Sequence, residues 1–240
     1  MRCLRGVQGV DPGRRCARSY AAKRTGSSND WIKRHVSDPY VKKATQLGYR
    51  SRAAFKLLEI DGKHRLLRPG MLALELGSAP GSWTQVLAAQ QVRTIAMDCL
   101  HMEPVDTCRF LQGDFSCPEM QQALLREVLA HDTAGADLIL SDISPNRSGH
   151  KILDEARLTS IIEQMLLIAR QCLKPGGALV AKVIQGADAP KLVRAVRAFS
   201  EPSLFKPPAS RSDSAEVYLV AKQFHPKRFD SSRWLREGLD

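Results

Sequence analysis

The sequence predicts an α/β fold in which a mostly parallel sheet is covered by helices on both faces. After Pro69-Gly70, short apolar runs alternate with longer helical stretches, and this order is typical of parallel strands joined by helices. The apolar runs cover residues 71–76, 94–97, 110–111, 137–140, 178–184 and 216–221, and the helical stretches cover 82–91, 118–131, 154–173 and 190–199. A chain of 240 residues fits one such domain with extensions.

Two helical segments precede the first strand. The first begins at Asp30 and continues past Pro39 to Leu47, and Ser51 is expected to cap the second, which carries apolar residues up to Ile60. These patterns predict a basic extension at residues 1–27, one domain at 28–225 and a C-terminal tail at 226–240.

Composition excludes several classes of protein. Hydrophobic residues at 43% and charged residues at 25% are usual for a globular domain, and no apolar run reaches the roughly 18 residues of a membrane span, so we expect no membrane partner. The six cysteines form no pair at zinc-ligand spacing. We therefore expect reduced thiols in an intracellular compartment and no metal.

Nearly all of the net charge of +11 lies at the front of the chain. Residues 1–52 carry 13 of the 36 basic residues and three of the 25 acidic ones, as expected of a protein that approaches a polyanion. Residues 1–27 are rich in arginine with Asp11 as their single acid, which is typical of transit peptides. We expect a mitochondrial matrix protein cleaved near Ala21; the alternative is an RNA-binding arm on a cytoplasmic or nuclear protein.

A glycine turn, Gly77-Ser78-Ala79-Pro80-Gly81, follows the first strand. In parallel sheets ligands bind beyond the carboxyl ends of the strands, and glycines at both ends of the turn would let its backbone approach a ligand closely. The spacing is not GxGxxG, and no phosphate-binding lysine follows, so a nicotinamide oxidoreductase is disfavoured. A purely structural turn remains the alternative for this segment alone.

Carboxylates follow the next two strands. Asp98 lies 21 residues after Gly77, where it would accept the ribose hydroxyls of a nucleoside, and Asp114 would accept from an adenine amine. Each aspartate alone is equally consistent with a helix cap. Together with the turn they predict an adenosine-shaped site without a phosphate cradle, which suits cationic S-adenosylmethionine better than a dinucleotide.

Lys182 lies in the middle of an apolar strand. A lysine there is costly to bury unless it is paired, and Asp142 at the end of the neighbouring strand is the expected partner. An edge lysine that reaches solvent is the alternative. Lys56, on the apolar stretch of the second helix, is a further candidate for an inward cation, although a solvated lysine is the commoner case.

At these positions the chain resembles the FtsJ-type 2′-O-ribose methyltransferases, especially the branch that modifies large-subunit ribosomal RNA in bacteria and mitochondria. The resemblance runs from about Ser28 to Ala221, and its motifs are residues 31–60 (with 49–57 among them), 77–85, 110–115, 137–149, 182–186 and 214–221. It implies a Rossmann-like methyltransferase fold with a seven-stranded sheet. Three serines, Ser78, Ser82 and Ser144, stand where this family usually has alanine or glycine, which affects donor affinity more than donor identity.

The resemblance also implies roles for individual residues. The family's catalytic tetrad falls on Lys56, Asp142, Lys182 and Glu216. Its contacts with the methyl donor fall on the glycine turn, the residues after it and the strand ends: Gly77, Pro80, Gly81, Trp83, Asp98, Asp114 and Asp142. The donor is S-adenosylmethionine, and no metal is implied.

Methyl transfer to a hydroxyl needs collinear atoms and the removal of one proton. Lys182 is the expected base, because burial, Lys56 and the positive donor all favour its neutral form. Asp142 would orient the amine and Glu216 would hold Lys56. Alternatively, Lys182 stays charged and steers the hydroxyl.

Six basic residues around the first two helices are expected to bind RNA phosphates: Lys33, Arg34, Lys42, Lys43, Arg50 and Arg52. We expect a monomer that methylates a uridine 2′-hydroxyl, in the A-loop of large-subunit rRNA within a ribosomal precursor. The alternative is a non-catalytic rRNA-binding assembly factor that keeps the fold. An amino-directed methyltransferase is disfavoured, because the segment Asp142-Ile143-Ser144-Pro145 lacks the Asp/Asn-Pro-Pro-aromatic turn.

Overall fold

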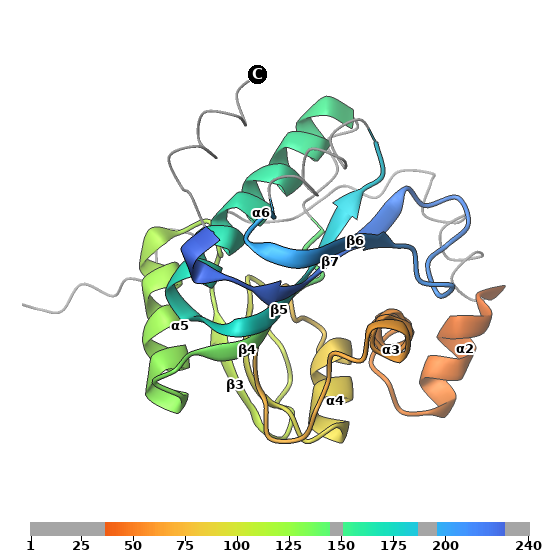
Figure 1. The fold of residues 1–240 in the computed structure, drawn as a ribbon. Helices are drawn as coiled ribbons and strands as arrows, with labels where there is room; N and C mark the ends of the chain where they lie inside the picture. Colours follow the sequence, from red (N-terminus) through yellow and green to blue (C-terminus); the bar gives the residue numbers. More distant parts are fainter. Residues whose placement is uncertain (1–36, 145–150, 187–195, 229–240) are drawn as a thin grey trace, which may run out of the picture.

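The computed structural model describes residues 37–144, 151–186 and 196–228 (Figure 1). Its helices are α2 Pro39–Gln46, α3 Ala53–His64, α4 Ser82–Ala89, α5 Pro118–His131, α6 Lys151–Cys172 and the short 3₁₀ helix η2 Pro226–Arg228. Its strands are β1 Leu72–Leu76, β2 Arg93–Asp98, β3 Cys108–Gln112, β4 Ala136–Ser141, β5 Leu173–Ile184, β6 Phe199–Phe205 and β7 Glu216–Phe224. The expected transit segment, Lys33, Arg34 and most of the expected tail lie outside the described residues.

The seven strands form one sheet in the order β3-β2-β1-β4-β5-β7-β6. Strands β1 to β5 pair in parallel, and β7 runs antiparallel to both β5 and β6. Helices α3 and α4 lie on one face of the sheet and α5 and α6 on the other (Figure 1). The predicted α/β fold is confirmed, and β1, between β2 and β4, marks the point where the strand order reverses.

Strand β6 differs from the sequence prediction, which placed the end of a helix at Phe199. That boundary was wrong, because Phe199 begins β6. The strand forms the edge of the sheet, and most of its residues are partly or fully exposed. It holds Glu201 and Pro202, and proline is tolerated at a sheet edge. The strand therefore lacks the continuous apolar run that indicated the central strands.

The two helices before the sheet start in different ways. Asp38 caps α2, with its Oδ1 accepting from the backbone N–H of Tyr40 at 3.0 Å. The cap position of α3 is Arg52, one residue after the expected Ser51, and the Arg52 side chain makes no capping bond. The Ser51 hydroxyl does accept from the backbone N–H of Ala53 at 3.2 Å, so it still supports the first turn.

The core consists of two main apolar clusters, one on each face of the sheet. On one face Leu57 and Ile60 of α3 pack with Val180 of β5 and Val220 of β7. Because side chains alternate along a strand, Lys182, Glu216 and Tyr218 point to this same face.

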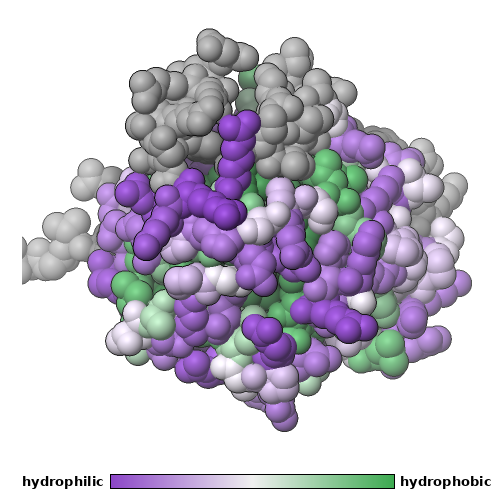
Figure 2. All heavy atoms as spheres, viewed as in Figure 1, coloured by the Kyte–Doolittle hydropathy of each residue, from purple (hydrophilic) through white to green (hydrophobic). Residues whose placement is uncertain are grey.

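The surface seen in the view of Figure 1 is largely hydrophilic, with smaller hydrophobic areas (Figure 2).

Candidate active site

The carboxyl ends of β1, β2 and β4 lie side by side. Leu76 is in register with Met97 on one side and Ser141 on the other. The next backbone groups continue this contact, since Asp142 N–H donates to the Leu76 carbonyl at 3.2 Å and Gly77 N–H donates to the Met97 carbonyl at 2.9 Å. The glycine turn, Asp98 and Asp142 therefore lie together at the carboxyl ends of the parallel strands, as predicted.

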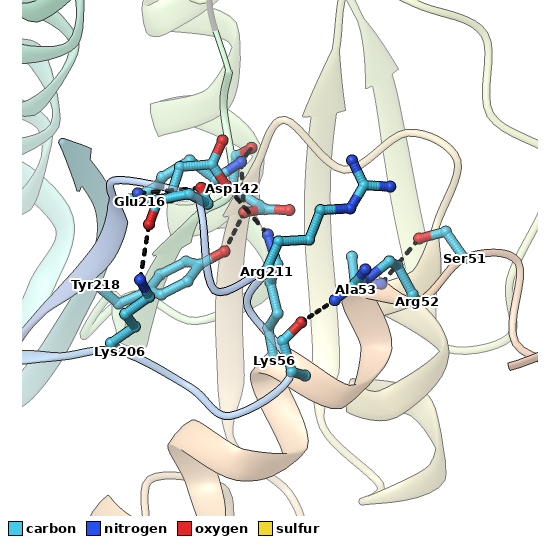
Figure 3. A network of polar contacts seen from close by, with 12 residues as sticks. Ser51, Arg52, Ala53, Lys56, Asp142, Lys206, Arg211, Glu216 and Tyr218 are labelled. Carbon is cyan, nitrogen blue, oxygen red and sulfur yellow. Dashed lines mark hydrogen bonds and ion pairs between the residues drawn. The ribbon is translucent and has the colours of Figure 1, made fainter. Parts of the chain in front are cut away.

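The four tetrad residues form two ion pairs beside each other. Lys182 Nζ lies 2.8 Å from Asp142 Oδ1 and donates to the Asp142 carbonyl at 2.9 Å, and its side chain is only 6% exposed. Lys56 Nζ lies 3.4 Å from Glu216 Oε2. Figure 3 shows Lys56 reaching from its helix toward Glu216 and Asp142. Both pairings expected from the sequence are present, whereas the catalytic roles stay predictions.

Opposing effects act on the Asp142 carboxyl. Burial by itself raises the pKa of Asp142, but the positive charges of Lys182 and Lys56 and hydrogen bonds from Lys182 and Tyr218 outweigh it and hold the pKa below its ordinary value. Asp142 is therefore ionised near neutral pH. Its negative charge stabilises the positive charges around it and fixes the direction of the Lys182 amine.

Tyr218 is a site residue that the sequence reasoning missed. Its hydroxyl donates to Asp142 Oδ1 at 2.5 Å, and its ring lies 5.6 Å from the Trp83 ring and 5.7 Å from Lys56 Nζ. Burial, followed by the negative charge of Asp142, raises the pKa of Tyr218 well above its ordinary value. Strand periodicity was the available signal, because Tyr218 lies two residues after Glu216 and so shares its face.

On the donor side, Asp98 joins two loops. Its Oδ2 accepts from Ala79 N–H at 2.9 Å and its Oδ1 from Leu100 N–H at 2.8 Å. Asp114 is exposed, and its Oδ1 accepts from the backbone N–H and the hydroxyl of Ser116 at 2.9 and 2.7 Å. Both carboxylates lie at the ends of neighbouring strands, where the sequence placed an adenosine site.

The glycine turn comes close to its surroundings at both ends. Gly77 and Gly81 have φ values of +74° and +105°, which L side chains adopt rarely. A Cβ at Gly77 would lie 2.7 Å from a side-chain atom of Ile143, and a Cβ at Gly81 would lie 2.5 Å from Arg50 Nη1. Both glycines are therefore required by the close approach of other parts of the protein, and contact of the turn with the donor stays a prediction.

Two other residues predicted for the donor site make internal contacts. Trp83 is buried and its indole N–H donates to the Ala53 carbonyl at 2.8 Å. The Pro80 carbonyl accepts from Arg50 Nη1 at 2.9 Å. The side chain of Trp83 therefore supports the start of α3, and contact of these residues with the donor stays a prediction.

Glu75 is a buried acid that the sequence reasoning missed. It lies in β1, is 1% exposed, and its Oε2 accepts from the Thr84 hydroxyl at 2.7 Å. Burial raises the pKa of Glu75 to about 8, the Thr84 hydrogen bond partly offsets this, and the charges of Asp142 and Asp98 add to it. A carboxyl between leucines in a strand, Leu74-Glu75-Leu76, was the signal in the sequence.

Four of the six basic residues predicted to bind RNA lie within the described part of the chain, and they fall into two groups. Lys42 and Lys43 are exposed on α2, where they can meet phosphates. Arg50 donates to three backbone carbonyls, and Arg52 pairs with Asp38 and donates to the Ala209 carbonyl. The structure thus gives the two arginines protein partners that the sequence did not indicate.

Within residues 37–144, 151–186 and 196–228, no three His, Cys, Asp or Glu side chains are grouped so that they could hold a metal ion. The helices of the same part of the chain include none that is long and apolar enough to cross a membrane.

The sheet order is that of a Rossmann-like fold, and the glycine turn and the two lysine–carboxylate pairs lie where the sequence predicted the sites of a methyltransferase dependent on S-adenosylmethionine. Residues 49–224 match the family described as FtsJ-like methyltransferase. The chain belongs to this family.

Bacterial relatives match over nearly their whole length. Ribosomal RNA large subunit methyltransferase E of Marinobacter nauticus is 46% identical over 206 residues, which cover 84% of this chain and 98% of the relative. The protein of the same name from Chromobacterium violaceum is 45% identical over 204 residues, covering 83% and 98%. A crystal structure of a ribosomal RNA methyltransferase from Plasmodium falciparum superposes with a TM-score of 0.64 at 28% identity, covering 73% of this chain and 98% of that one.

Proposed function

We propose that this protein transfers a methyl group from S-adenosylmethionine to a ribose 2′-hydroxyl of large-subunit ribosomal RNA. The observation that carries the proposal is the buried Lys182–Asp142 pair next to the Lys56–Glu216 pair, at the strand ends that also hold the glycine turn. The names of the bacterial relatives support the same substrate class.

Lys182 is the group that we assign to the substrate hydroxyl. When bound, S-adenosylmethionine supplies a methyl group already activated on a sulfonium. One carboxylate oxygen and the backbone carbonyl oxygen of Asp142 contact Lys182 Nζ. They occupy two of the three hydrogen-bonding directions of the amine, and we assign the third to the 2′-hydroxyl. There the neutral amine accepts the hydroxyl proton as the oxygen takes the methyl group and the demethylated donor leaves. Alternatively, an ammonium holds the oxygen in line and the proton passes to solvent.

The remaining site residues position this amine. Asp142 is held from two sides, by Lys182 and by the Tyr218 hydroxyl. Glu216 fixes Lys56, whose positive charge acts on Asp142. The positive charge of Lys56 favours loss of a proton from the substrate, because it stabilises the developing negative charge on oxygen.

For the finer assignment, we propose a uridine of the A-loop in a ribosomal precursor within the mitochondrial matrix, methylated by a monomer. The resemblance to the large-subunit rRNA branch supports the nucleotide. The arginine-rich, acid-poor composition of residues 1–27 supports the compartment. A tagged full-length chain should enter mitochondria and mature near Ala21; a nuclear or cytosolic tag that keeps the extension would contradict the compartment.

The decisive experiment for the function maps ribose methylation in organellar and cytosolic rRNA of cells with and without the protein. One large-subunit uridine should lose its 2′-O-methyl group in the absence of the protein and regain it on re-expression. Unchanged methylation in both sets of rRNA would refute the proposal.

A further inference from the structure

Arg50 lies between the glycine turn and the loop that follows β2. Its Nη1 donates to the carbonyls of Pro80 at 2.9 Å and Glu103 at 2.8 Å, and its Nη2 donates to the carbonyl of Pro104 at 2.8 Å. A planar guanidinium with five donors suits such contacts, whereas a lysine amine has no matching fork. One side chain therefore ties together two loops that border the donor site.

The backbone at Arg50 is tied to the same region. The Arg50 N–H donates to Gln85 Oε1 at 2.8 Å, and Gln85 Nε2 donates to the Gly48 carbonyl at 2.9 Å. Gln85 lies in α4, the helix that begins at the glycine turn. Both the main chain and the side chain of Arg50 thus connect the segment before α3 to the donor-binding turn.

The guanidinium rests directly against the turn. A Cβ at Gly81 would lie 2.5 Å from Arg50 Nη1 and 3.1 Å from the sulfur of Met102. Any side chain at Gly81 would therefore displace Arg50. The narrow shape of the turn and the place of the arginine depend on each other.

The segment that starts at Arg50 continues into the helix that presents Lys56. The hydroxyls of Ser51 and Ser82 share a hydrogen bond of 2.7 Å, and the Trp83 indole N–H donates to the Ala53 carbonyl at 2.8 Å. Lys56 follows Ala53 within one turn of α3. A series of hydrogen bonds therefore joins the glycine turn to the first turn of α3, the helix that carries Lys56.

We propose that Arg50 is a positioning residue of the methyl-transfer reaction, which holds the donor-binding turn against the segment that carries Lys56. In this role Arg50 fixes the position of the donor site relative to the ribose site. The role differs from the phosphate contact that the sequence suggested for Arg50. The part that concerns the ribose site rests on the proposed function, and the part that concerns the donor does not.

The test compares Arg50→Lys and Arg50→Ala with a matched control, Lys42→Ala, which removes an exposed cation from α2. Calorimetry with S-adenosylmethionine in the absence of RNA reads the donor site. Both Arg50 variants should bind the donor about tenfold or more weakly, because Arg50→Ala loses all three charged hydrogen bonds and Arg50→Lys has no planar fork with which to make them together. Lys42→Ala should bind the donor as wild type does. The salt dependence of RNA binding should fall for Lys42→Ala and stay unchanged for the Arg50 variants.

Turnover separates positioning from general loss of structure. The Arg50 variants should keep their RNA KM while kcat falls, even at donor concentrations that saturate the site. Should Arg50→Ala fail to fold, Ser82→Ala removes the Ser51–Ser82 hydrogen bond of the same series. It should give a smaller loss of donor affinity and kcat.

Wild-type donor affinity in Arg50→Lys, or a salt dependence lowered as in Lys42→Ala, would overturn the proposal and return Arg50 to phosphate binding. Failure of the proposed function would look different. A wild-type protein that binds S-adenosylmethionine but methylates no rRNA would refute the function, and the donor affinities would still decide the role of Arg50.

Discussion

Replacing Glu75 by glutamine should remove a pH-dependent loss of stability. Burial raises the pKa of Glu75 from 4.5 to about 8, so the folded protein holds a proton that the unfolded chain releases above about pH 4.5. The free energy of unfolding therefore falls as pH rises, by about 1.4 kcal/mol per pH unit for one proton. Between about pH 5 and pH 8 the loss amounts to roughly 4 kcal/mol at most, and above the folded pKa it no longer grows.

Glutamine has nearly the same shape, carries no charge and can keep a hydrogen bond with Thr84. Urea unfolding of wild type and Glu75→Gln at one-unit steps from pH 4 to pH 9 measures the difference, in which the titration of all other groups largely cancels. The free energy of unfolding of the variant should rise relative to that of wild type from about pH 5 to pH 8. Above pH 8 the difference between the two should stay constant. Glu119→Gln, at an exposed glutamate of α5, is the control. Parallel curves for wild type and Glu75→Gln would refute the reasoning.

Three further outcomes are expected. Asp98→Ala should weaken S-adenosylmethionine binding by about 1.5 to 3 kcal/mol in calorimetry; tight NADH binding with no response to the methyl donor would contradict the donor assignment. Changing Lys42 and Lys43 to Gln should lower the salt slope of RNA binding by about 0.7 to 0.9 for each phosphate that the protein no longer neutralises, without affecting the donor, and an unchanged slope would make them ordinary surface residues. Leu57→Ala should cost about 2 to 5 kcal/mol of unfolding free energy, as measured in urea, and a cost below about 1 kcal/mol would be inconsistent with its buried position.

Much of the site follows from strand ends and charge in the sequence. A parallel sheet brings successive carboxyl ends to one edge, so the strand pattern alone places Gly77, Asp98 and Asp142 together. Lys182 is recognisable because an unpaired lysine is unfavourable in an apolar strand, and its partner is the predicted one.

Other parts depend on contacts between segments that are far apart in the chain. Arg50 stands among other basic residues in the sequence, and only the folded chain brings it to the carbonyls of Pro80, Glu103 and Pro104. The half-exposed edge strand that begins at Phe199 lacks an apolar run. Tyr218 reads as an ordinary aromatic residue of a buried strand until its hydroxyl is seen at Asp142.

Methyl transfer by Lys182→Ala tests the central claim most directly. The measurement is 2′-O-methylation of ribosomal substrate by purified wild type and variant at saturating S-adenosylmethionine, with donor and RNA affinities determined in parallel. Because general acid–base catalysis contributes about a hundredfold to ten-thousandfold, the variant should lose at least this factor in rate while it still folds and binds both substrates. Wild-type turnover by Lys182→Ala would contradict the assignment of Lys182 to the substrate hydroxyl.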